Sequence, residues 1–330
     1  MQCMGSILEV RDLHFAYRSS GEDLHRALNG VSFCLESGEV LGVLGESGSG
    51  KSTLAISLLR LFRRDSVVNG AILFQGKDLL KAESQELQAI RGKSISLIFQ
   101  EPSVALHPTI RVDQQVRRIL AAHRMGEQDE LDRRTRKVFE TLFGEGAERV
   151  ASSFPHQLSG GQRQRVLIAQ AIACRPSVVV ADEPTASLDP TTQMEILNVF
   201  RDLRKRLDLT MIFITHNPAL LSRLADRVLV LYAGRVVELG PARAVLVSPK
   251  HPYTQALFRS IPPLEVPRDA GKRILPAIPR DASLLSCMPR EGCPFEPRCP
   301  ERMEPCKSKD PGFVNLSESH IVSCFRYESQ

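Results

Sequence analysis

The sequence predicts an α/β fold in which a mainly parallel β-sheet is wrapped by helices. Short apolar runs recur along the chain, such as EVLGVL at residues 39–44 and SVVVAD at residues 177–182. Segments with helical spacing of apolar residues separate these runs, and such alternation is typical of a parallel sheet. The composition of the 330 residues, 42% hydrophobic and 25% charged, is that of an ordinary globular protein.

The first hundred residues supply several of these elements. Residues 7–17 alternate like a strand, residues 27–39 form a second strand that ends in a turn, and residues 71–76 give another. We expect these segments to build an antiparallel β subdomain. Residues 52–62 have helical spacing, residues 81–91 form a polar helix, and residues 94–100 form a buried strand.

The middle of the chain differs in composition and in the spacing of its apolar residues. Residues 113–154 are charge-rich and helical in pattern, without a strand candidate. We therefore expect a helical subdomain at about residues 101–170, inserted into the α/β core. Strands at 177–182, 210–216, 227–234 and 235–240 then alternate with helices at 163–175, 191–207 and 219–226.

The C-terminal part is rich in proline and cysteine from about residue 249 to residue 311, and its periodicity is poor. This change divides the chain into a domain at residues 1–247 and a small Cys/Pro-rich extension at residues 248–330. We expect the extension to be a separate appendage, held together by something other than a hydrophobic core.

Several classes of protein are disfavoured. No apolar run approaches the roughly 18 residues of a membrane span, and the N-terminus lacks the features of a signal peptide. We therefore expect a cytoplasmic location. A net charge of +5 spread over the chain and the absence of tryptophan give no indication of nucleic acid as a partner.

The segment GESGSGKST fits the phosphate-loop pattern G-x-x-x-x-G-K-[ST] between an expected strand and an expected helix. Glycines let backbone N–H groups surround a phosphate, Lys51 reaches the β- and γ-phosphates, and the Ser52 hydroxyl binds Mg²⁺. A tight turn that matches by chance is the alternative, and the strand–loop–helix context disfavours it. The expected nucleotide-binding residues here are Gly45, Glu46, Ser47, Gly48, Ser49, Gly50, Lys51, Ser52 and Thr53.

Polar side chains follow other strands of the expected sheet. Asp182 and Glu183 end a buried strand, where the first carboxylate suits Mg²⁺ and the second suits a general base for water. Gln100 and His216 also end strands, within reach of the magnesium shell and the γ-phosphate. Each alone would more often be an ordinary strand end, but parallel sheets bind ligands at this edge.

The segment LSGGQ begins a predicted amphipathic helix. Its serine is a good N-cap, its glycines expose backbone N–H groups, and such a helix start attracts phosphate. Because the chain already has one phosphate loop, this second start suggests a site completed by another subunit. The motif consists of Leu158, Ser159, Gly160, Gly161 and Gln162.

With these motifs in this order, residues 7–240 resemble the nucleotide-binding subunits of ABC transporters. The resemblance implies ATP and Mg²⁺ as cofactors, the latter on Ser52, Gln100 and Asp182, and ATP hydrolysis with Glu183 as base and His216 as switch. It also implies a head-to-tail pair in which LSGGQ of one subunit faces the ATP of the other. By position, Tyr17 matches the aromatic residue that stacks on adenine. The loop at the dimer seam matches Ser187, Leu188 and Asp189.

Residues 248–262 and CPFEPRCP at 293–300 are similar to the tails of ATP-binding subunits that drive oligopeptide, dipeptide and nickel importers. This resemblance implies two membrane permeases, a second ATPase subunit (homologous or identical), an extracytoplasmic solute-binding protein and a place on the cytoplasmic face of the inner membrane. Two alternatives stay open. One is a soluble ABC ATPase of DNA repair or translation, and the other is a regulatory ATPase subunit that senses iron or redox state.

Five of the eight cysteines crowd the tail: Cys287, Cys293, Cys299, Cys306 and Cys324. The last four have the spacing C-x5-C-x6-C-x17-C, which is not the C-x2-C of zinc ribbons. Four thiolates suit a [4Fe–4S] cluster, and the resemblance to peptide importers implies one at matching cysteines. Buried cysteines without metal remain an equal alternative, and zinc is a third.

Overall fold

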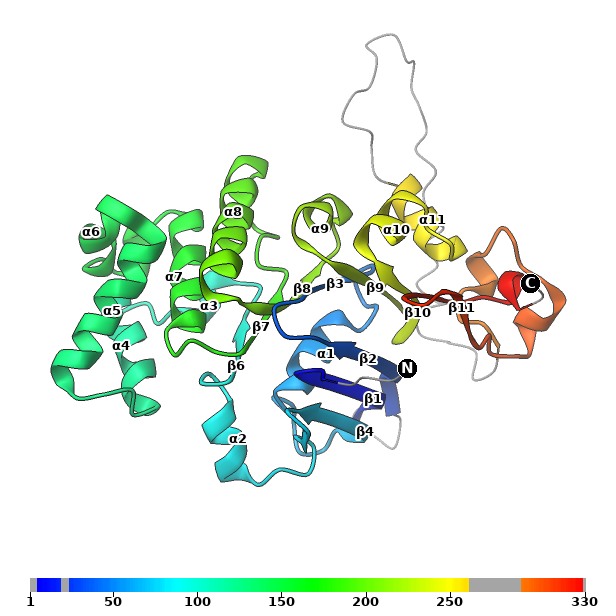
Figure 1. The fold of residues 1–330 in the computed structure, drawn as a ribbon, viewed down its shortest axis with the longest axis horizontal. Coiled ribbons are helices and arrows are strands. Elements are labelled where there is room, and N and C mark those ends of the chain that lie inside the picture. Colours follow the sequence, from blue (N-terminus) through cyan, green and yellow to red (C-terminus); the bar gives the residue numbers. More distant parts are fainter. Residues whose placement is uncertain (1–4, 19–23, 261–291, 329–330) are drawn as a thin grey trace, which may run out of the picture.

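The computed structural model describes residues 5–18, 24–260 and 292–328, and it contains two sheets (Figure 1). The larger sheet has the strand order β11–β12–β10–β9–β3–β8–β7–β6. Its strands are β3 (Val40–Leu44), β6 (Ile95–Ile98), β7 (Val178–Asp182), β8 (Thr210–Thr215), β9 (Arg227–Tyr232), β10 (Arg235–Pro241), β11 (Phe313–Ser317) and β12 (His320–Ser323).

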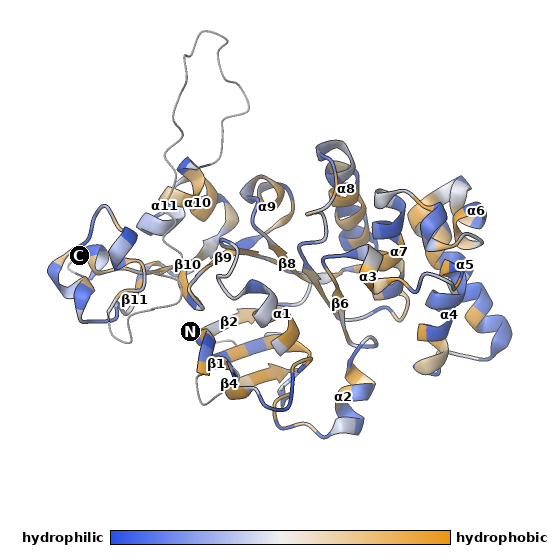
Figure 2. Cartoon of the chain, turned by 180° about the vertical axis from the view of Figure 1, so that it is seen from behind, coloured by the Kyte–Doolittle hydropathy of each residue, from blue (hydrophilic) through white to orange (hydrophobic). Residues whose placement is uncertain are grey.

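The middle of this sheet is parallel. The neighbouring pairs from β9 through β3, β8 and β7 to β6 all run in the same direction. Every residue of β3, β7 and β8 is buried, as expected for strands that are covered on both faces. Figure 2 shows β8, in the middle of the sheet, in the orange of apolar residues. The predicted mainly parallel sheet is confirmed.

The smaller sheet is antiparallel and has the order β2–β1–β4–β5. Its strands are β1 (Leu8–Arg18), β2 (Leu24–Leu35), β4 (Val67–Phe74) and β5 (Lys77–Asp78). Helix α1 (Lys51–Leu58) lies between the two sheets and shares a hydrophobic cluster with both of them. The polar helix α2 (Ser84–Ile90) follows. This sheet is the predicted antiparallel subdomain.

The inserted region is helical throughout. It contains α3 (Pro102–Ala105), α4 (Val112–Ala122), α5 (Gln128–Phe143), α6 (Ala147–Ala151) and α7 (Gly160–Ile172). Residues 99–177 are all described, and no strand lies among them. Helices α4 and α5 bury Val116, Leu120 and Phe139, whereas much of their surface is hydrophilic (Figure 2). Further along, α8 (Pro190–Leu207), α9 (Pro218–Leu224), α10 (Ala242–Val247) and α11 (Pro252–Arg259) complete the second hydrophobic cluster.

The C-terminal region departs from expectation. Strand β12 pairs antiparallel with β10, with Glu238 opposite Val322, so β11 and β12 extend the large sheet. Tyr253, Leu257 and Phe295 are buried within the same second hydrophobic cluster. The expected separate appendage is therefore not confirmed, because backbone pairing and aromatic packing join it to the core. Cys287 and its neighbours in residues 261–291 lie outside the described residues.

No helix in the described part of the chain is both long and apolar enough to cross a membrane.

Candidate active site

A cavity of about 800 Å³ opens at the carboxyl ends of the parallel strands. It gathers groups that are far apart in the sequence, as expected for a sheet of this type. The predicted residues that line it are Tyr17, Glu46, Ser47, Gly48, Gly50, Lys51, Ser52, Thr53, Gln100, Glu183 and His216. The sequence-based grouping of the phosphate loop with three strand ends is thus reproduced in space.

The backbone of the phosphate loop requires glycine at particular points. Gly48 and Gly50 have φ angles of 81° and 102°, in the left-handed region that glycine adopts without steric cost. A Cβ on Gly50 would lie 2.6 Å from the carbonyl oxygen of Ala27. One on Gly45 would lie 2.3 Å from that of Leu231. The loop is therefore packed against its surroundings before any nucleotide binds.

Lys51 is the cation of this loop, and its side chain is only 5% exposed. Its Nζ donates to the carbonyl oxygens of Gly45 (2.9 Å) and Glu46 (2.8 Å) and lies 3.6 Å from Glu183 Oε1. Burial lowers the pKa of Lys51, and the carboxylates of Glu183 and Asp182 oppose that effect. The ammonium group is thus positioned inside the cavity by the loop that it serves.

Glu183 lies at the centre of the predicted catalytic groups. Its Oε2 is 3.0 Å from Nδ1 of His216, so the carboxylate contacts both the expected switch histidine and Lys51. Its backbone has a φ of 44°, which is unusual for a residue with a side chain. Strain of this kind costs on the order of 1–3 kcal/mol and is concentrated at functional sites. The geometry places a carboxylate where it can accept a proton from water.

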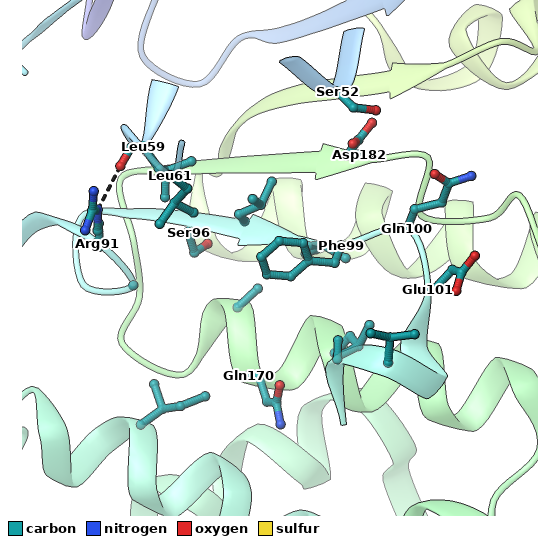
Figure 3. Close-up of a pocket in the computed structure, with 18 of the residues that line it drawn as sticks. Ser52, Leu59, Leu61, Arg91, Ser96, Phe99, Gln100, Glu101, Gln170 and Asp182 are labelled. Carbon is teal, nitrogen blue, oxygen red and sulfur yellow. Dashed lines mark hydrogen bonds between the residues drawn. The ribbon is translucent and has the colours of Figure 1, made fainter. Parts of the chain in front are cut away.

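The residues predicted to bind Mg²⁺ fit that ion. Ser52 and Asp182 lie with their oxygens facing each other, and Gln100 lies nearby (Figure 3). Among the described residues, Asp182 Oδ1 is buried without a hydrogen-bond partner. Burial raises the pKa of Asp182, and the Ser52 hydroxyl lowers it. Oxygen ligands supplemented by phosphate oxygens are what Mg²⁺ prefers.

Tyr17 lies at the edge of the cavity, on β1. Its hydroxyl is 3.1 Å from Thr53 Oγ1, and its ring packs edge-on against Phe15 at 4.8 Å between centroids. The ring also lines the cavity. Its predicted stacking on adenine is compatible with this place and stays a prediction.

The LSGGQ segment lies elsewhere. Ser159 caps α7, with its Oγ 3.3 Å from Gln162 N and its own N–H donating to Gln162 Oε1 at 3.1 Å. None of residues 158–162 is among the described residues that line the cavity. A Cβ on Gly161 would lie 2.6 Å from Thr192 Cγ2, so this helix start abuts α8. Asp189 caps α8 through the N–H groups of residues 191 and 192.

The segment with LSGGQ and the seam-loop residues Ser187, Leu188 and Asp189 are thus neighbours. Ser159, Ser187 and Asp189 are exposed. An exposed helix start that lies outside its own chain's cavity is compatible with a shared site. Their predicted roles at a dimer seam remain predictions.

Sequence reasoning missed the part of the tail that reaches this site. Arg298 forms an ion pair with Glu46, at 3.1 Å between Nη1 and Oε2. The Tyr253 hydroxyl accepts a hydrogen bond from the Glu46 N–H at 2.9 Å. Leu257 and Ser260 also line the cavity. These contacts span more than 200 residues, and no local pattern indicates them.

The four predicted cysteines line one small cavity of about 10 Å³, room for about one water molecule. Burial raises the pKa of Cys293 and Cys299 to about 11, and it also raises that of Cys324. Within the described residues, no group of three or more His, Cys, Asp or Glu side chains is arranged to hold a metal ion. The four cysteines therefore surround one small space, without an arrangement among the described residues that fits a metal ion.

Comparisons with known proteins agree with this geometry. A family model described as "ABC transporter" matches residues 28–186, and one described as "Oligopeptide/dipeptide transporter, C-terminal region" matches residues 237–306. The chain is 39% identical to the dipeptide transport ATP-binding protein DppD of Bacillus subtilis, over 98% of this chain and 95% of that protein. It is 36% identical to the oligopeptide transport ATP-binding protein OppD of Escherichia coli, over 97% and 93%.

A solved structure also matches. It is the dimeric post-hydrolysis state of the ATP-binding cassette MJ0796 bound to ADP and Pi, with a TM-score of 0.63 and 28% identity. The match covers 72% of this chain and 99% of that one. The predicted ABC ATPase core is thereby confirmed.

Proposed function

The chain belongs to the ABC transporter family as an ATP-binding, ATP-hydrolysing subunit, and from this premise we propose that it drives the import of di- or oligopeptides. The observation that best supports ATP hydrolysis is that the phosphate loop, Glu183 and His216 line one cavity. In this proposal Lys51 binds the terminal phosphates. Glu183 accepts a proton from the attacking water, and His216 and Lys51 stabilise the charge that develops on the γ-phosphate.

The C-terminal region supports peptides as the solute. It matches the family model of the oligopeptide/dipeptide type. The relatives reported above are named for dipeptide or oligopeptide transport, and each of them aligns with nearly the whole of this chain. Nickel, which the sequence resemblance left open, is the alternative solute. The observation that favours peptides is the agreement of full-length relatives rather than any contact in this chain.

A second cavity, of about 810 Å³, supports docking to membrane partners. It lies between the parallel sheet and the helical insert, and Gln100, Glu101 and Gln170 border it (Figure 3). Phe99 is 49% exposed and Val104 is 79% exposed at its rim. Apolar side chains in a surface cavity favour an apolar partner segment.

We infer that a permease segment occupies this cavity. Because Gln100, Ser52 and Asp182 border both this cavity and the magnesium site, nucleotide binding and permease docking act on the same strand ends. The complex then consists of two permeases, this chain, a second ATPase subunit and an extracytoplasmic solute-binding protein. The chain would sit on the cytoplasmic face of the inner membrane.

The test is ATP-driven uptake by the native complex, purified through a tag on this chain and reconstituted into vesicles with a solute-binding protein. Uptake of a labelled oligopeptide that needs ATP, and that disappears with Glu183→Gln, supports the proposal. A complex without membrane subunits, or one that transports nickel and not peptide, contradicts it. The nickel result would leave the ATPase assignment intact and replace the solute.

The cysteine cavity supports a second, separate proposal, namely that the four thiols bind a [4Fe–4S] cluster. The favouring observation is that Cys293, Cys299, Cys306 and Cys324 all face one space. The donor set fits such a cluster, whereas the present space of about 10 Å³ does not. Binding would therefore require the surrounding turns to move apart. Zinc and a metal-free pocket are the alternatives.

Iron, sulfide and zinc assays on anaerobically purified protein distinguish these outcomes. About four irons per chain, lost with Cys299→Ser but kept with Cys174→Ser, support the cluster. Cys174 is the matched control because it is a buried free cysteine just after α7 and does not line the cavity. Protein with stoichiometric zinc, or without metal, contradicts the cluster.

A further inference from the structure

The phosphate loop is held from outside by the C-terminal region, and the point of contact is Glu46. Three groups fix this residue. Its carbonyl oxygen accepts from Lys51 Nζ at 2.8 Å, its N–H donates to the Tyr253 hydroxyl at 2.9 Å, and its carboxylate pairs with Arg298. Two of the three groups belong to the tail, and neither is a residue of the phosphate-loop motif.

The ion pair with Arg298 is two-pronged and largely hidden from solvent. Nη1 lies 3.1 Å from Glu46 Oε2, and Nη2 lies 3.2 Å from Glu46 Oε1. Nη1 also donates to the Tyr232 hydroxyl at 3.2 Å. The arginine side chain is 5% exposed and the glutamate side chain 25%. Bidentate arginine–carboxylate pairs of this kind fix orientation as well as charge.

The surroundings of Arg298 keep it in place. Its guanidinium lies over the rings of Tyr232 and Phe295, at 5.6 and 6.0 Å from their centroids. Those two rings and Tyr253 pack against one another with centroids 4.5 to 5.5 Å apart. Phe295 and Tyr253 are almost completely buried. The arginine is thus built into the core and aimed at the loop.

Charge explains why the loop needs this partner. Glu46 lines the nucleotide cavity and belongs to the phosphate loop, so a carboxylate lies close to the place where the phosphates of ATP bind. A bare carboxylate there would repel the polyphosphate, and the repulsion is strongest where water is partly excluded. We propose that Arg298 is a positioning residue of the ATP site, which neutralises Glu46 and holds its carboxylate away from the phosphates, with Tyr253 fixing the backbone beside it.

The decisive experiment compares ATP affinity and turnover of the full chain in its native complex for Arg298→Gln, Glu46→Gln and the double variant. We expect Arg298→Gln to raise the KM and the Kd for ATP about tenfold, the size of one lost charged hydrogen-bonding pair. The kcat should stay within about twofold, because Arg298 contacts none of the reacting groups. Adding Glu46→Gln should bring the Kd back to within about threefold of the wild type.

The rescue separates this role from mere support of the fold. If the tail contact only stabilised structure, the double variant would be no better than the single one, and that result would overturn the proposal. The matched control is Asp310→Asn. It breaks another ion pair between the tail and the sheet, Arg235 Nη1 to Asp310 Oδ1 at 2.8 Å, and neither of these two residues is among the described residues that line the nucleotide cavity. Its Kd for ATP should be unchanged, and a tenfold rise would count against the proposal.

If Arg298→Gln does not fold, Tyr253→Phe still tests whether the tail positions the phosphate loop for ATP. This variant removes one hydroxyl from a buried ring and keeps the aromatic packing. We expect it to weaken ATP binding about threefold, with a kcat close to that of the wild type. An affinity equal to that of the wild type would contradict the positioning of the loop by the tail.

Discussion

The nucleotide cavity and the cysteine cavity differ in how far each is prepared for a ligand. The first measures about 800 Å³ and is bordered by charged and hydroxyl groups held at strand ends. The second measures about 10 Å³, and burial raises the pKa of three thiols that line it, those of Cys293, Cys299 and Cys324. One site is open and electrostatically matched to a polyphosphate, whereas the other is closed and disfavours thiolates. The backbone therefore builds the first site in advance, and the second would have to be opened by its ligand.

The largest expected effect tests the chemistry of the open cavity. Replacing Glu183 by Gln removes the proposed base and keeps the size of the side chain. Turnover of ATP should fall about 10²- to 10⁴-fold, whereas equilibrium binding of ATP should persist. Steady-state hydrolysis and nucleotide binding measure the two quantities.

The control for this change is Asp202→Asn, which alters an exposed carboxylate on α8. It should leave turnover unchanged. Hydrolysis by Glu183→Gln at more than a tenth of the wild-type rate would show that another group activates the water.

A second prediction concerns pH and the closed region. His251 lines the cysteine cavity, and burial lowers its pKa to about 3. The unfolded chain binds a proton below about pH 6.5, whereas the folded chain stays neutral until about pH 3. This histidine therefore contributes stability above pH 6.5 that is lost as the pH falls, about 2 kcal/mol between pH 7 and pH 5.

Chemical denaturation at the two pH values measures this loss. In His251→Asn the loss should be about 2 kcal/mol smaller, because asparagine does not titrate. The Tyr253 N–H, which donates to His251 Nδ1 at 3.0 Å, still finds an acceptor in the asparagine side chain. The same pH sensitivity in both proteins would mean that His251 is not buried in its neutral form.

The smallest expected effect sharpens the contrast between the two cavities. Cys299→Ser changes the closed cavity and no residue that lines the open one. The kcat and the KM for ATP should each change less than about threefold. This change in KM is smaller than the roughly tenfold rise expected for Arg298→Gln. Assays of both variants in parallel make the comparison. A larger effect of Cys299→Ser would mean that the two cavities act as one unit.

The sequence was most informative where chemistry is contained in short segments. The phosphate loop, Glu183 and His216 each follow a strand, so a pattern of strand and motif was enough to bring them together. The parallel core and the helical insert followed from apolar periodicity in the same way. The tail was predicted less well, since the pairing of β10 with β12 joins Glu238 to Val322 across more than 80 residues and leaves no local trace.

The contact between Arg298 and Glu46 was missed for the same reason. In the sequence, Arg298 is one of many arginines, in a segment that drew attention for its cysteines. Only the fold shows that the turn between Cys293 and Cys299 presents this side chain to the phosphate loop. For the cysteines the sequence left a cluster, zinc and a metal-free pocket open, and no pattern of spacing reveals how little space they enclose.

In the proposed complex the nucleotide site is divided, with the phosphate loop and base in this chain's cavity and the LSGGQ segment serving a partner's ATP. The most direct measurement is ATP binding and turnover for Ser159→Arg, at the exposed start of α7. The isolated variant chain should bind ATP with a Kd within about twofold of the wild type, because residues 158–162 do not line its described cavity. Hydrolysis by the complex should fall at least tenfold. Loss of ATP binding by the isolated variant chain, or unchanged hydrolysis by its complex, would contradict a divided site.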